Sequence, residues 1–201
     1  KLGDYPYQQV RLYEIPFYQE EVYAFGNGIA ISEKEGWIAD IAGLKEKAYL
    51  YQTVSSGVLQ HWVQKSFKIA NVQGADMVRL ALPEALALQL VQNKLGDKAV
   101  DLLIEQKEKI YNKDRYSDPN GEPSLLYADG KDYLEVNKGA IELYQWSKAL
   151  GFERFNQILL DWQQAPEDVA LFKTLYERLL AASPADVKQE MEDTFTASGS
   201  D

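Results

Sequence analysis

The segment from about Ala75 to Leu95 places the strongest constraint on the fold. Read as a helix, it has apolar residues facing nearly all directions: Leu80, Leu82, Leu86, Leu88, Leu90 and Val91. A helix of this kind needs other elements around it, so we expect it in the core. Gly96 ends the segment, and Pro83 is expected to kink the helix or to restart it as its first helical residue.

Helical periodicity continues on both sides of this segment. The pattern from about residue 44 to 68 predicts a buried helix, with Val54, Val58 and Trp62 on one face. An amphipathic helix is predicted over 97–112, and residues 113–130 are predicted to form a long charged loop. Further helices are predicted at about 132–150, 152–163, 167–181 and 185–195, the last with Ser183 as its cap and Pro184 behind it.

Strand and turn patterns occupy residues 7–33. Val10, Leu12 and Ile15 lie among polar and aromatic residues, and Gly26-Asn27-Gly28 predicts a tight turn before residues 29–31. The predicted fold class is therefore mainly α. We expect a β lead-in over residues 1–45 and a helical subdomain over residues 46–201.

Composition excludes several classes of function. The 201-residue chain has 21 Lys and Arg against 31 Asp and Glu, a formal charge of -10, so it would repel nucleic acid. The absence of Cys excludes thiolate catalysis and Cys-based metal sites. No apolar run reaches the roughly 20 residues that span a bilayer. Because the sequence begins at Lys1 without an initiator Met, we expect a fragment whose partners include other domains of the same protein.

Four short stretches occur in a recognisable order along the chain. They are YPYQQVRLYEIP at 5–16, ISE at 31–33, ANVQGA at 70–75 and KGAI at 138–141. In this order and spacing the chain resembles the M1 family of zinc aminopeptidases, particularly the bacterial branch joined to ABC-transporter permeases. The similarity runs from about residue 3 to beyond residue 160. It implies the helical, thermolysin-like (gluzincin) catalytic subdomain of that family.

The resemblance also locates the residues that would hold zinc. M1 enzymes use an H-E-x-x-H helix, whose Glu acts as base on the metal-bound water, and a Glu on the following helix. Anchored on ANVQGA, the two His positions fall at Ser56 and Gln60 and the base at Gly57. The third ligand falls at Arg79 or Leu80, depending on a one-residue ambiguity. None of these side chains is a usual zinc ligand, so we expect the ancestral zinc to be lost and no cofactor to be bound.

Two further catalytic features of the family are missing in this reading. The Tyr that stabilises the oxyanion falls at Val136, and Tyr133 lies one turn earlier. The exopeptidase strand corresponds to residues 24–28, which contain no acid to hold a substrate amine. His61 is the only histidine and has no ligand at helical spacing, so we interpret it as a structural helix residue.

A serine hydrolase is a second reading of Ser56, and the geometry rejects it. Ser56 and His61 are five residues apart, so on a helix their side chains point about 140° away from each other. Nothing in the sequence orients the imidazole as a catalytic triad requires.

The sequence therefore predicts a non-catalytic, M1-like pseudopeptidase domain on the extracytoplasmic face of a membrane protein linked to an ABC-type exporter. Two alternatives stay open: an active metallo-aminopeptidase with ligands from outside this chain, and a structural spacer. An open cleft would favour binding of a peptide or protein partner, whereas a cleft filled by Leu80 and Val136 would favour a spacer. The expected lining residues are Gln60, His61, Tyr133, Ile29 and Ile31.

Overall fold

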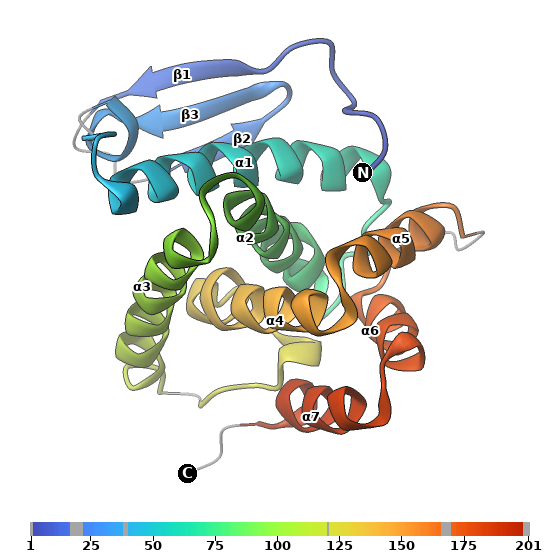
Figure 1. Ribbon diagram of the computed structural model, residues 1–201. Coiled ribbons are helices and arrows are strands. Elements are labelled where there is room, and N and C mark those ends of the chain that lie inside the picture. Colours follow the sequence, from blue (N-terminus) through green and yellow to red (C-terminus); the bar gives the residue numbers. More distant parts are fainter. Residues whose placement is uncertain (1, 17–21, 38–39, 120, 166–169, 199–201) are drawn as a thin grey trace.

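A small sheet and a group of helices lie on opposite sides of one long helix (Figure 1). The computed structural model describes residues 2–16, 22–37, 40–119, 121–165 and 170–198. Within these ranges the chain forms seven α-helices and a three-stranded sheet near its N-terminus. The predicted class, mainly α with a short β lead-in, is confirmed at this level.

The sheet consists of β1 (Arg11–Ile15), β2 (Val22–Phe25) and β3 (Gly28–Ser32), in the order β1-β3-β2. β3 pairs parallel with β1 and antiparallel with β2, and all five of its residues are buried. The predicted turn before β3 is confirmed, and Gly26 adopts the positive φ of +52° that favours glycine. Ile29 and Ile31 alternate with Ala30 along β3, so their side chains face the same side of the sheet.

Helix α1 (Leu44–Ser66) runs beneath this sheet, as the periodicity predicted. The short η1 (Glu33–Trp37) precedes it. On the other side of α1, a π-helical turn η2 (Met77–Ala81) leads into α2 (Leu82–Leu95). Helix α2 contacts α1, α3 (Asp97–Arg115) and α4 (Ala140–Leu150), so the segment expected in the core lies there. Leu90 departs from this, with 37% of its surface exposed, and so do Asn93 and Lys94 near the end of α2.

Helix α2 begins at Leu82, so Pro83 is its second residue, one position later than a restart with Pro83 as the first helical residue would place it. It occupies the first turn of the helix, where its missing N–H costs no hydrogen bond. The turn before it is widened to a π-helix, which accommodates the discontinuity in the backbone hydrogen bonding. The chain therefore passes from η2 to α2 without leaving the core.

The C-terminal half consists of helices joined by short connections. η4 (Tyr133–Gly139) is a second π-helical stretch and leads into α4, followed by α5 (Phe152–Gln163), α6 (Phe172–Ala182) and α7 (Ala185–Thr196). The predicted helix over 132–150 is thus π-helical in its first part. Residues 167–169 of the predicted helix over 167–181 lie outside the described residues, and α6 begins at Phe172.

Two local predictions are wrong. Helix α3 extends to Arg115, into the predicted loop over 113–130, and that loop contains the short 3-10 helix η3 (Leu125–Tyr127). Ser183 does not cap α7, whose N-cap is Pro184. Instead, Ser183 Oγ accepts a hydrogen bond from Trp146 Nε1 and donates one to Leu179 O, each over 2.8 Å. The buried indole N–H of Trp146 needs an acceptor, and the Ser183 hydroxyl that accepts its hydrogen bond is not available to cap α7.

Candidate functional site

A cavity of about 680 Å³ lies between β2, α1, η2, α2, α3 and η4. Its wall combines apolar side chains such as Leu103 and Ile110 with the amides of Gln60 and Gln106. Ligand-binding cavities commonly have volumes of about 300–1,000 Å³ and this mixture of apolar walls and a few polar groups. The cavity is therefore large enough for a small molecule or a short stretch of peptide.

Five positions at which the M1 resemblance places catalytic machinery line this one cavity. They are Ser56, Gly57, Gln60, Leu80 and Val136. They come from three separate elements, α1, η2 and η4, and lie up to 80 positions apart in the sequence (56 to 136). The fold thus brings together residues that were singled out only by their order along the chain.

The two candidates for the third position differ in their place relative to the cavity. Leu80 lines the cavity, whereas Arg79 does not. The guanidinium of Arg79 lies 3.5 Å from the carboxylate of Asp76, one turn earlier along the chain. Leu80 is therefore the residue of η2 that occupies the position facing α1.

Gly57 is small because β3 approaches α1 closely at this point. A Cβ atom on Gly57 would lie 2.8 Å from Cδ1 of Ile29 and within 3.1 Å of two further carbons of the same side chain. The Ile29 side chain thus occupies the space into which a longer residue at position 57 would extend. Ile29 and Ile31 are both buried, and neither is among the residues that line the cavity.

A buried ion pair lies in the wall of the cavity and joins three helices. Lys107 Nζ on α3 donates to Glu84 Oε2 on α2 over 2.8 Å, and the two side chains are 9% and 11% exposed. The second oxygen of Glu84 accepts from the hydroxyl of Ser56, and Gln52 of α1 donates to Oε2. Both carboxylate oxygens are therefore bonded within the protein.

The same lysine connects α3 to η4. Lys107 Nζ donates a second hydrogen bond, over 2.9 Å, to the backbone oxygen of Val136. The ammonium thus lies between α2 and η4, beside positions 56 and 136. A buried positive charge, paired with Glu84, is therefore part of the wall that the five assigned positions also line.

His61 and Tyr133, two of the expected lining residues, point elsewhere. His61 Nε2 donates to the carbonyl oxygen of Gly28 over 3.0 Å, so Nδ1 accepts from the hydroxyl of Tyr5 over 2.8 Å. Burial lowers the pKa of His61, which favours the neutral ring that these two bonds require. The Tyr133 hydroxyl donates to Asp118 over 2.7 Å, and burial raises the pKa of this phenol.

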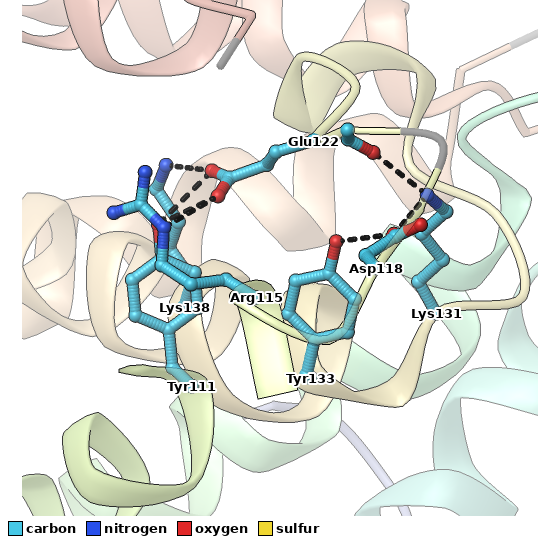
Figure 2. A network of polar contacts seen from close by, with 8 residues as sticks. Tyr111, Arg115, Asp118, Glu122, Lys131, Tyr133 and Lys138 are labelled. Carbon is cyan, nitrogen blue, oxygen red and sulfur yellow. Dashed lines mark hydrogen bonds and ion pairs between the residues drawn. The ribbon is translucent and has the colours of Figure 1, made fainter. Parts of the chain in front are cut away.

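Tyr133 belongs to a polar network that holds the segment after α3 (Figure 2). Glu122 accepts from Tyr111 over 2.8 Å and from Lys138, and Lys131 bonds to Asp118. Ring stacking adds a contact, because the Tyr111 and Tyr133 centroids are 6.3 Å apart. The charged segment predicted as a loop is thus tied to α3 and η4 by ion pairs.

The sequence analysis assigned no role to Glu84, Lys107 or Gln52. One signal for Glu84 was present: it is the only charged residue between Leu80 and Val91, so a buried partner was required. The partner could not be chosen from the sequence, because α3 also contains Lys98, Lys109 and Lys113. Only the packing of α3 against α2 selects Lys107.

No protein-family profile matches the sequence, and a search of curated proteins finds no significant match. Among the described residues, no group of three or more His, Cys, Asp or Glu side chains is placed to hold a metal ion. In the same part of the chain, no helix is both long and apolar enough to cross a membrane.

Proposed function

We propose that this chain is a non-catalytic relative of the M1 zinc aminopeptidases, with a thermolysin-like helical subdomain whose cavity binds a peptide or protein partner. One observation carries the proposal. The positions of both zinc-binding histidines, the base, the third ligand and the oxyanion tyrosine, assigned from motif order alone, converge on a single cavity. Ser56, Gly57 and Gln60 are neighbours on α1, so the weight of this observation rests on Leu80 of η2 and Val136 of η4, which line the same cavity.

The chemistry of the wall supports a non-catalytic role. Ser56 donates to Glu84, Gly57 has no side chain, and Leu80 and Val136 are apolar. The ammonium of Lys107 is paired with the Glu84 carboxylate, which accepts a hydrogen bond from Ser56 at one of the assigned histidine positions. A zinc ion would have to displace this ion pair as well as find new ligands.

An extended peptide fits the edge of the sheet. Within the described residues β2 has one strand neighbour, β3, so its other edge is available for backbone hydrogen bonds. Val22 and Ala24 of β2 line the cavity. A chain that added to this edge would place alternate side chains in the cavity, which is a common mode of peptide recognition.

The cavity volume favours binding over a purely structural spacer. A spacer gains stability from close packing, to which a cavity of about 680 Å³ does not contribute. The alternative of an active enzyme requires at least three metal ligands from other parts of a longer protein. Location on the extracytoplasmic face of a membrane protein linked to an ABC-type exporter is part of this proposal and rests on the resemblance.

Turnover of fluorogenic aminoacyl substrates tests the proposal. The purified chain, supplied with zinc, should release no fluorophore above the uncatalysed rate. Hydrolysis that a metal chelator abolishes would overturn the non-catalytic assignment.

Rebuilding the zinc site tests the assignment of the five positions. The variant combines Ser56→His, Gly57→Glu, Gln60→His and Leu80→Glu with two supporting changes, Ile29→Ala and Lys107→Met. Ile29→Ala makes room for the new glutamate, and Lys107→Met removes a charge that would oppose the metal. We expect this variant to bind one zinc ion. A matched control with Arg79→Glu in place of Leu80→Glu should bind zinc more weakly, since Arg79 does not line the cavity.

Circular dichroism establishes that both variants are folded. If the folded Leu80→Glu variant takes up no zinc, or no more than the Arg79→Glu control, the assigned positions are wrong.

A further inference from the structure

The cavity has a donor at its inner end that the protein does not use. An ammonium group has three N–H donors, and Lys107 directs two of them to Glu84 Oε2 and Val136 O. Lys107 is 93% buried and also lines the cavity, so its third N–H is available to a bound molecule. A buried donor without an acceptor is unfavourable, and a ligand oxygen would satisfy it.

The charge around Lys107 determines which oxygen suits this donor. Glu84 and Lys107 neutralise each other, and Asp132 is the only other charged residue of the wall, so the wall has one positive and two negative groups. A ligand carboxylate would meet a net negative charge. An uncharged carbonyl oxygen accepts the hydrogen bond without that repulsion.

Asp132 offers the complementary group nearer to solvent. It is exposed, and among the described residues its carboxylate has no hydrogen-bond or ion-pair partner. Its backbone oxygen accepts from Asn137 Nδ2 over 3.3 Å, which fixes the position of this part of the wall. An unpaired carboxylate beside a cavity attracts a cation, and the net charge of -10 on the chain adds to this attraction.

Two amides share this wall with Lys107 and Asp132. Gln60 on α1 and Gln106 on α3 line the cavity, and neither side chain has a hydrogen-bond partner in the described part of the chain. Each primary amide offers both donors and an acceptor, so the pair matches the alternating N–H and C=O groups of a peptide. Apolar contacts with Leu103 and Ile110 complete the wall.

We propose that the cavity selects amide ligands with a positively charged nitrogen, binding a carbonyl oxygen at Lys107 and the cation at Asp132. This inference rests on the proposed binding function and adds its specificity. The cation is a lysine side chain of a bound peptide or the free amine at its N-terminus, which share the same ammonium chemistry. In this arrangement Lys107 binds the carbonyl oxygen through an ammonium in place of a metal ion.

Nuclear magnetic resonance titration of the 201-residue chain tests the selectivity. The probes are N-acetylated, C-amidated alanine pentapeptides with lysine, alanine or glutamate at the centre, and an alanine pentapeptide with a free N-terminal amine. The side-chain amide signals of Gln60 and Gln106 report binding within the cavity. We expect the lysine peptide to bind about fivefold more tightly than the blocked alanine peptide, the size of an exposed ion pair. The free-amine peptide distinguishes the two sources of the cation.

Two variants separate the roles of the two charged residues. Asp132→Asn should abolish the preference for a cation, whereas Asp186→Asn, which removes the same charge from the exposed start of α7, should preserve it. The double variant Lys107→Met with Glu84→Gln removes both charges of the ion pair together. It should weaken the binding of all four peptides by a similar factor and leave the preference for a cation intact.

The outcomes distinguish this inference from the function on which it rests. Equal affinity for the lysine, alanine and glutamate peptides, with shifts at Gln60 and Gln106, would overturn the selectivity and leave the binding function standing. An equal effect of Asp132→Asn and Asp186→Asn would also overturn it. If no peptide shifts either amide, the binding function itself is wrong.

Discussion

The ion pair between Lys107 and Glu84 makes the sharpest prediction about stability. Lys107→Met removes the ammonium and retains most of the aliphatic length of the side chain. Glu84 then remains buried with its negative charge and only Ser56 and Gln52 as donors. Val136 O also loses a donor. Glu84→Gln has the opposite effect, because the Lys107 ammonium then remains buried without a carboxylate partner.

Burial sets the magnitude of these effects. The two side chains are 9% and 11% exposed, so neither charge is compensated by solvent once its partner is removed. Breaking a buried ion pair on one side costs about 3–5 kcal/mol. We expect about 3 kcal/mol for each single variant, because each remaining charge keeps at least one hydrogen-bond partner. The double variant, Lys107→Met with Glu84→Gln, leaves no charge and should also lose about 3 kcal/mol instead of the sum, about 6 kcal/mol.

Urea unfolding followed by tryptophan fluorescence and circular dichroism measures these free energies. The expected coupling between the two substitutions is about 3 kcal/mol, well above the error of such a cycle. The matched control is Lys109→Met with Glu105→Gln, an exposed ion pair on α3 that should show coupling below about 1 kcal/mol. Additive effects at positions 107 and 84, or single losses below about 1 kcal/mol, would refute a buried ion pair at this site.

Three further variants test other parts of the structure. Burial raises the pKa of Glu135 from 4.5 to about 7, so its charge lowers the stability of the folded state as pH rises through this range. Glu135→Gln should therefore stabilise the protein by up to about 3 kcal/mol at pH 8 and have little effect at pH 4, as measured by urea unfolding; equal effects at both pH values would contradict this. Gly57→Ala should destabilise by about 1 kcal/mol through overpacking against Ile29, and should become stabilising when Ile29→Ala is present; the same sign in both backgrounds would show that the contact is absent. Glu122→Gln should raise the hydrogen-exchange rates of amides in residues 121–131 about tenfold, because the ion pair with Lys138 is lost; unchanged rates would mean that this network does not hold the segment.

Much of the helical architecture was predictable because local signals agree with the tertiary structure. Gly96 and Gly151 have positive φ values of +86° and +83° and separate consecutive helices where the sequence indicated breaks. Pro83 lies in the first turn of α2, where its missing N–H is tolerated. The π-helical turns η2 and η4 were not predictable, since they arise where helices adjust to their neighbours. Ser183 was misassigned because its acceptor role depends on Trp146, which lies 37 residues away.

The order of motifs selected five residues that line one cavity, whereas contacts that depend on the relative positions of helices were not predicted. The assigned positions on α1, η2 and η4 lie together in the cavity. The direction of the Tyr133 side chain was not predicted. In an α-helix Tyr133 and Val136 would lie close together around the helix axis, whereas the wider turns of the π-helical η4 increase the angle between their side chains. Pairing of Glu84 with Lys107 required knowledge of how α2 packs on α3.

The zinc content of the purified chain tests the central claim most directly. The protein is equilibrated with excess zinc, free metal is removed by gel filtration, and bound zinc is measured by mass spectrometry of the elements. We expect no stoichiometric zinc, because Ser56, Gly57, Gln60 and Leu80 are not usual zinc ligands and the paired charges of Lys107 and Glu84 line the same cavity. One tightly held zinc ion per chain would contradict it.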